Sequence, residues 1–141
     1  MDLRPVTALF AVAPQLTVED FAAVAAAGYA LVVNNRPDGE APGQLSHAEA
    51  AAAAAAAGLA YAHIPFSGGF SREDVQAMRE ALQSTAGPAL AYCRSGTRSI
   101  TLWAHVQAQE GKPVAELLLM ARAAGYDLSG MAGSLRAMAP A

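Results

Sequence analysis

The chain has 141 residues, of which 15% are charged, and its formal net charge is −3. This length supports one domain with a sizeable core, expected to span residues 1–141, and the acidic balance argues against a nucleic-acid-binding surface. The single cysteine excludes an internal disulfide and fits a reducing compartment, so we expect a cytoplasmic protein. The unbroken alanine run at 50–57 indicates a helix and not a membrane span, so we expect no membrane contact.

Apolar runs alternate with segments that carry helix-start signals. The apolar runs predict strands at 8–13, 29–33, 59–64 and 89–92. Three helices begin at a capping Thr or Ser, with acidic residues in the first turn. They start at Thr17, Ser46 and Ser71, and glycines end the first two. Further helices are predicted at 97–109, 113–124 and 129–138.

Strands that alternate with helices predict the α/β class. We expect a single domain with a central, mainly parallel sheet of about four to five strands, flanked by helices. Such sheets bind ligands at the carboxyl ends of their strands. Three loops leave such ends, at 34–44, 66–70 and 94–97, and we expect them to converge.

The cysteine, Cys93, follows an apolar strand and opens a short polar loop in which a helix begins. Backbone N–H groups at a helix N-terminus and a nearby guanidinium both stabilise a thiolate. We expect the amides of Ser95, Gly96 and Thr97 to turn inward and form a nest for a tetrahedral anion. Arg98 would bind two oxygens of that anion at once. The pattern therefore predicts a reactive thiol beside an anion site.

Three more residues are expected to support this site. Arg94 would hold an anionic group beside the thiol, and Ser99 would donate a hydrogen bond to the sulfur. Arg36 is interpreted as a second anion contact, with a loop anchor as the alternative. The alternative for Cys93 is a small buried hydrophobe, which does not explain two arginines and a glycine within five residues of the thiol.

Several motifs resemble the bacterial beta-lactamase-hydrolase-like, phosphatase-like domains. These motifs are Asn34–Glu40, His63–Pro65, Ala91–Ser99 and Gly125–Asp127, and the likeness extends from about residue 5 to residue 130. The resemblance implies the fold of the cysteine-dependent protein phosphatases, which is protein-tyrosine-phosphatase-like. Some members of that family are fused to, or work beside, persulfide-oxidising enzymes, so the resemblance also implies a link to sulfur metabolism.

Two features depart from ordinary dual-specificity phosphatases. Their loop reads Cys-x5-Arg, whereas four residues separate Cys93 from Arg98. The place of their aspartate general acid is taken by the segment 67–69, which has no carboxylate. The cysteine loop instead resembles that of single-domain rhodaneses, which carry a sulfur atom on the cysteine as a persulfide.

The first hypothesis is a phosphatase-like hydrolase that acts on phosphomonoesters. Cys93 would attack phosphorus, Arg98 and the loop amides would hold the equatorial oxygens, and a phosphocysteine would form. The leaving group needs a proton, for which Asp38 is the candidate donor, with Glu40 behind it. The alternative for Asp38 is a turn residue within Pro37–Gly39.

The second hypothesis is a rhodanese-like sulfurtransferase, in which Cys93 takes sulfane sulfur while Arg94 and Arg98 hold the anionic donor. Its shorter loop fits a persulfide, and it needs no aspartate acid. The third is a non-catalytic anion-binding or redox-sensing module. We favour the phosphatase-like hydrolase, because the resemblance covers nearly the whole chain.

The expected partner is a small anionic substrate, or a phosphorylated or persulfidated molecule. Three scattered histidines lack metal-ligand spacing, so we expect no metal and no cofactor.

Overall fold

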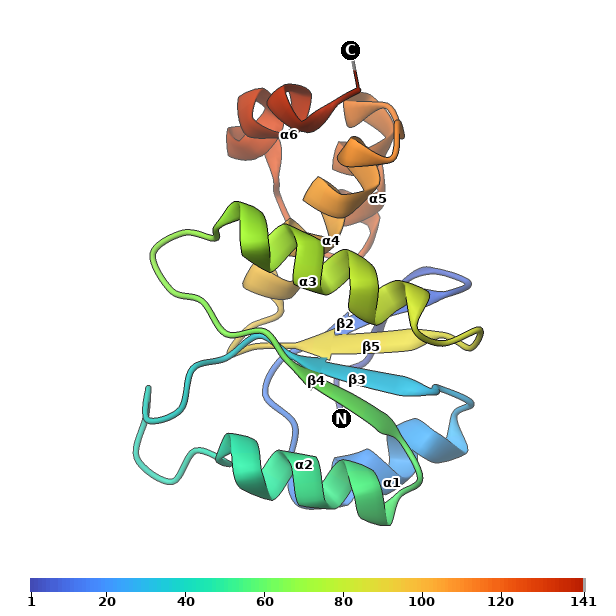
Figure 1. The fold of residues 1–141 in the computed structure, drawn as a ribbon, viewed down its shortest axis with the longest axis vertical. Helices are drawn as coiled ribbons and strands as arrows, with labels where there is room; N and C mark the ends of the chain where they lie inside the picture. The colour runs from blue at the N-terminus through green and yellow to red at the C-terminus, as the bar shows by residue number, and fades with distance from the viewer. Residues whose placement is uncertain (141) are drawn as a thin grey trace.

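The computed structural model describes residues 1–140, which form a five-stranded sheet between two layers of helices (Figure 1). The strand order is β1-β2-β5-β3-β4, and every pair is parallel except β1 with β2. The predicted α/β class and mainly parallel sheet are therefore confirmed. The strands are β1 (Arg4–Thr7), β2 (Phe10–Ala13), β3 (Leu31–Asn34), β4 (Ala60–His63) and β5 (Ala89–Tyr92).

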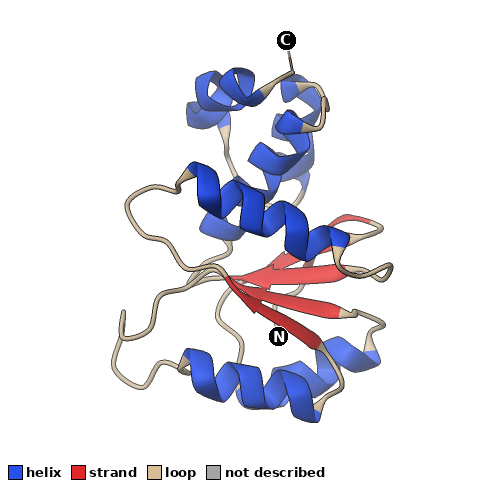
Figure 2. Cartoon of the chain, viewed as in Figure 1, coloured by secondary structure: helices blue, strands red, loops and turns tan. Residues whose placement is uncertain are grey.

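Helices cover both faces of the sheet, as Figure 2 shows in blue. α1 and α2 lie on one face, α3 and α4 lie on the other, and α5 and α6 pack beyond α4 (Figure 1). No helix within residues 1–140 has the length and apolar character needed to cross a bilayer. The helices are α1 (Val18–Ala26), α2 (His47–Ala56), α3 (Arg72–Gln83), α4 (Thr97–Gln109), α5 (Val114–Ala123) and α6 (Ala132–Met138), the last preceded by a 3₁₀ turn, Ser129–Met131.

Because successive strand residues point to opposite faces, the sheet divides the core in two. Both halves are closed to solvent, which explains why the central strands β2, β3 and β5 are apolar apart from Asn34 at the end of β3. On the α3–α4 side, the rings of Phe10 and Trp103 stack at 5.1 Å. On the α1–α2 side, Tyr92 meets Phe21 edge to face at 6.3 Å.

The helix starts agree with the capping residues read from the sequence. Ser46 Oγ accepts from the Glu49 amide at 3.1 Å, and the Glu49 carboxylate accepts from the Ser46 amide at 3.0 Å. Ser71 and Asp74 make the same reciprocal pair at 3.1 and 2.8 Å. Each pair satisfies two backbone donors that the helix leaves unpaired, so these caps set where the helices begin.

The first predicted strand is wrong in extent. The segment predicted as one strand at 8–13 is the second half of a hairpin, in which β1 lies antiparallel to β2 at the edge of the sheet. Pro5 is tolerated in β1 because an edge strand leaves one row of its backbone groups unpaired. Thr7 Oγ1 accepts from the Leu9 amide at 3.1 Å and closes the turn.

Truncation of Phe10 tests the stacked core beneath the hairpin. We expect Phe10→Ala to lower the free energy of unfolding by about 3–5 kcal/mol, because it removes a buried ring and leaves a cavity against Trp103. Urea denaturation gives the value. Leu9→Ala is the neighbouring control, and it should change stability by less than about 0.5 kcal/mol because Leu9 is 63% exposed. Equal effects of the two substitutions would contradict this assignment of the core.

Candidate active site

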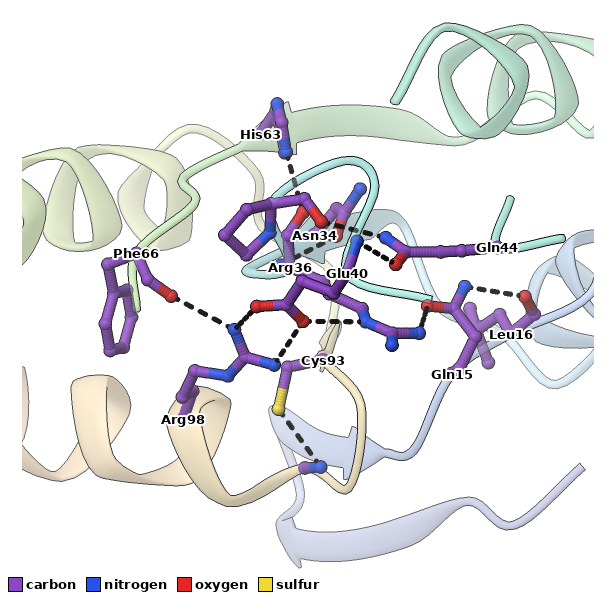
Figure 3. A network of polar contacts seen from close by, with 12 residues as sticks. Gln15, Leu16, Asn34, Arg36, Glu40, Gln44, His63, Phe66, Cys93 and Arg98 are labelled. Atoms are coloured by element: carbon purple, nitrogen blue, oxygen red, sulfur yellow. Dashed lines mark hydrogen bonds and ion pairs between the residues drawn. The ribbon is translucent and has the colours of Figure 1, made fainter. Parts of the chain in front are cut away.

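The three loops predicted to converge, which follow β3, β4 and β5, meet around Cys93, and the loop after β2 joins them (Figure 3). Cys93 directly follows β5 and is 1% exposed. The loop after β2 is joined to it by the Gln15 amide, which donates to the Arg94 carbonyl at 3.2 Å. The loops after β3 and β4 are reached by Arg98, whose guanidinium donates to Glu40 and to the Phe66 carbonyl.

The Cys93 sulfur lies at the N-terminus of α4. The Gly96 amide donates to Sγ at 3.1 Å, and the helix begins at the next residue. Gly96 has a φ of +95°, a conformation that residues with a Cβ rarely adopt. A Cβ there would also collide with the Tyr126 hydroxyl. The loop therefore requires glycine at this position to turn an amide toward the sulfur.

The Arg98 side chain is fixed by a carboxylate. Its Nη1 and Nη2 atoms donate to the two oxygens of Glu40, each at 2.8 Å, and Nη1 also donates to the Phe66 carbonyl at 3.1 Å. The hydrogen bonds to Glu40 raise the pKa of Arg98, and the nearby Cys93 side chain adds a smaller contribution. The Nε–H makes no hydrogen bond with another residue of the described range 1–140.

A second guanidinium holds the other side of Glu40. Arg36 is 5% exposed, and its Nε donates to Glu40 Oε1 at 2.9 Å while Nη1 donates to Gln15 Oε1 at 3.0 Å. These are the contacts of a loop anchor, the alternative to the predicted anion contact. Hydrogen bonds from Arg98 first, and then from Arg36, lower the pKa of Glu40 to about 2. Glu40 is therefore ionised at neutral pH and ties the loop after β3 to the start of α4.

The other predicted residues lie in different surroundings. Asp38 Oδ1 accepts from the His47 amide at 2.7 Å, which places the proposed proton donor at the N-terminus of α2. Arg94 is exposed, and its side chain has no hydrogen-bond or ion-pair partner within residues 1–140. The hydroxyls of Ser95 and Thr97 pair with each other at 3.1 Å.

Ser99 does not make the contact expected of it. Its side chain is fully buried, and its Oγ has no hydrogen-bond partner within the described part of the chain. Among the described residues, the expected donation from this hydroxyl to the sulfur is absent, and the sulfur accepts from the Gly96 amide instead.

Sequence reasoning gave no role to Gln15 and Tyr126, and it placed Glu40 only behind Asp38. All three act through partners far along the chain: Glu40 and Arg98 are 58 positions apart, and Tyr126 donates to the carbonyl of Ser95, 31 positions away. One signal was available for Tyr126, because it belongs to the Gly125–Asp127 motif.

The low pKa of Glu40 predicts a pH-dependent contribution to stability. Because the folded value, about 2, lies below the ordinary 4.5, the ion pairs stabilise the fold fully above about pH 4.5, and this stabilisation is lost as the pH falls toward 2. Glu40→Gln should therefore be less stable than the parent at pH 7, and the difference should shrink across that acidic range. Urea midpoints at several pH values measure this. The exposed Glu116→Gln is the control, and a Glu40→Gln deficit that stays constant with pH would refute the assignment.

Solved structures share this architecture. The crystal structure of a "putative phosphatase" from Neisseria meningitidis Z2491 is 32% identical, covers 98% of this chain and 99% of that chain, and has a TM-score of 0.86. Tk-PTP in its active form is 17% identical, with 95% of this chain and 92% of that chain covered and a TM-score of 0.72. The predicted protein-tyrosine-phosphatase-like fold is confirmed.

The sequence comparisons agree. A "Beta-lactamase hydrolase-like protein" of Agrobacterium fabrum is 36% identical over 102 residues, which is 72% of this chain and 24% of that protein. The chain therefore spans about a quarter of the length of this curated relative. The family model named "Beta-lactamase hydrolase-like protein, phosphatase-like domain" matches residues 2–110. The chain belongs to the family of beta-lactamase-hydrolase-like, phosphatase-like domains.

Proposed function

We propose that the chain is a cysteine-dependent hydrolase that acts on phosphomonoesters through a phosphocysteine intermediate. The observation that carries the proposal is the position of the Cys93 sulfur, which accepts from the Gly96 amide at the start of α4 beside the anchored Arg98. Backbone donors and a guanidinium around a thiolate form an electrostatic environment suited to both the nucleophile and a phosphoryl group. Membership of a phosphatase-like family supports the same class.

The reaction would proceed in two displacements at phosphorus. The Cys93 thiolate attacks, an S–P bond forms and the P–O bond to the leaving group breaks, with the electron pair departing on that oxygen. Water then attacks phosphorus, the S–P bond breaks and inorganic phosphate leaves with the thiolate restored. In both steps the Nε–H of Arg98 and the loop amides would hold the equatorial oxygens, where charge is spread in the transition state.

The surroundings of the carboxylates favour substrates whose leaving group departs without a proton. Glu40 is ionised by its two arginine partners and cannot serve as a general acid near neutral pH. Asp38, the donor expected from the sequence, is engaged with the His47 amide at the start of α2. We therefore propose aryl phosphates, whose phenolates are stable anions, as better substrates than alkyl phosphates.

Sulfur transfer is the second candidate function, and the spacing of the loop favours it. Four residues separate Cys93 from Arg98, one fewer than in the dual-specificity loop, and a smaller cradle suits a persulfide. With thiosulfate as donor, the thiolate would attack the outer sulfur, an S–S bond would form on Cys93 and sulfite would leave. A nucleophile such as cyanide would then remove the sulfur. This candidate retains the expected link to a persulfide-oxidising enzyme.

Substitutions at the nucleophile and at the guanidinium test the proposal. Cys93→Ser should abolish aryl phosphate hydrolysis, and Arg98→Lys should reduce it by about 100-fold or more, because lysine cannot form the two-pronged contact. The surface variant Arg79→Lys is the control and should retain full activity. Mass spectrometry of the trapped enzyme distinguishes an added phosphoryl group from an added sulfur.

If the trapped enzyme carries an added sulfur and turns over thiosulfate in the presence of cyanide, the function is sulfur transfer and not phosphate hydrolysis. If neither substrate is turned over, the third hypothesis remains, which is a non-catalytic anion-binding or redox-sensing module. Phosphatase activity that persists in Cys93→Ser would end the cysteine mechanism.

Asp38→Asn separates a structural aspartate from a proton donor. The amide oxygen of asparagine can still accept from the His47 amide, so the start of α2 should be preserved. We expect kcat for both aryl and alkyl phosphates to stay within about twofold of the parent, since no proton is taken from this residue. A steady-state comparison of the two substrate types measures this. A selective loss of alkyl phosphate turnover of about 100-fold would instead make Asp38 the acid.

A further inference from the structure

One residue from the C-terminal part of the chain contacts the cysteine loop. Tyr126 follows α5, is 7% exposed, and donates from its hydroxyl to the Ser95 carbonyl at 2.8 Å. Its position is fixed by the end of that helix, where Gly125 has a φ of +98° and the Tyr126 amide donates back to the Ala121 carbonyl at 2.9 Å. The tyrosine therefore presents its hydroxyl from a rigid element outside the loop.

The carbonyl that Tyr126 binds belongs to the same peptide unit as the amide that reaches the sulfur. A peptide unit is planar and trans, so its carbonyl oxygen and its N–H point in opposite directions. Between Ser95 and Gly96, the oxygen accepts from Tyr126 at 2.8 Å, and the N–H donates to Cys93 Sγ at 3.1 Å. One rotation of this plane would break both hydrogen bonds together.

Apart from these two hydrogen bonds, the conformation of Gly96 does not resist the rotation. Turning the plane over would replace the positive φ of Gly96 by a negative φ, which is the ordinary conformation of most residues. It would also point the Ser95 carbonyl oxygen toward the sulfur, where its partial negative charge would oppose a thiolate. Within the described residues 1–140, the Ser95 carbonyl accepts no hydrogen bond except that from Tyr126, so no residue of the loop itself holds it.

The tyrosine ring is braced in turn by the first strand. The Arg4 guanidinium lies over the ring, 5.1 Å from its centroid, and Asp2 accepts from Arg4 at 2.8 Å. Burial raises the pKa of Tyr126, which keeps its hydroxyl protonated and able to donate at neutral pH. The contact thus joins β1, the end of α5 and the cysteine loop.

We propose that Tyr126 is a positioning residue, which locks the Ser95–Gly96 peptide unit in the orientation that presents an amide N–H to the Cys93 sulfur. The inference rests on the proposed function in that Cys93 is taken to be the reacting nucleophile. It is independent of whether a phosphoryl group or a sulfur atom is transferred.

The test compares Tyr126→Phe with the parent and with Tyr29→Phe, which changes a tyrosine at the opposite end of the sheet. Phenylalanine keeps the ring beneath Arg4 and removes only the hydroxyl. The readout is the rate of Cys93 alkylation by iodoacetamide at about pH 6.5, divided by the rate at about pH 9.5. We expect this ratio to fall by about fivefold in Tyr126→Phe and to stay unchanged in Tyr29→Phe.

A second readout is protection of the thiol by inorganic phosphate. The concentration that halves the alkylation rate should rise several-fold in Tyr126→Phe, because the amide nest loses its orientation. Circular dichroism establishes that each variant is folded. An unchanged ratio in folded Tyr126→Phe overturns the inference. If that variant does not fold, Gly96→Ala provides the same test, because its methyl group disfavours the positive φ; there, too, an unchanged ratio overturns it.

These outcomes are separable from those of the proposed function. If the protein hydrolyses no phosphomonoester but its alkylation ratio depends on Tyr126, the proposed function is contradicted and the positioning role is supported. If the protein hydrolyses aryl phosphates and its alkylation ratio does not depend on Tyr126, the proposed function is supported and the positioning role is contradicted.

Discussion

The site is organised by a single carboxylate held between two guanidiniums. Glu40 accepts from Arg98 through both of its oxygens and from Arg36 through one, and this ties the loop after β3 to the start of α4. Arg98 extends the tie to the loop after β4 through the Phe66 carbonyl. The arginine side chains of Arg36 and Arg98 are 6% and 22% exposed, and that of Glu40 is 26% exposed, so water partly screens these ion pairs. Without this bridge the Arg98 guanidinium would lose its two hydrogen bonds to Glu40 and keep the one to the Phe66 carbonyl.

The bridge also determines how charge is distributed around the sulfur. Glu40 neutralises part of the positive charge of the two arginines, and within residues 1–140 the Nε–H of Arg98 makes no hydrogen bond. The Cys93 sulfur itself is contacted by the backbone: it accepts a hydrogen bond from the Gly96 amide, at the N-terminus of α4. Fixed dipoles and one oriented cation can bind an anion without reorganisation, which is the property that a site for phosphoryl or sulfane-sulfur transfer needs.

The sequence was informative wherever the determining interaction is local. Helix starts at Ser46 and Ser71 follow from capping pairs three residues apart, and the strand–cysteine–helix order of β5 and α4 follows from a short apolar run and a glycine. The β1–β2 hairpin was missed because its turn lacks the glycine or asparagine that normally signals one. The partners of Arg98 and Tyr126 were missed for a different reason: these contacts join distant positions and arise only when the sheet brings the loops together. Asp38 shows the same limit, since a Pro-Asp-Gly segment does not reveal which amide its carboxylate will meet.

The depth of Cys93 sets a shape requirement on whatever reacts there. With 1% of the residue accessible, little of the sulfur faces solvent, so a reacting atom would have to reach it at the tip of a slender group. A terminal phosphoryl or sulfane sulfur on a narrow stem meets this requirement, whereas a reacting centre embedded in a bulky, branched scaffold does not. Steric selection by depth would therefore act before any recognition of the remainder of the molecule.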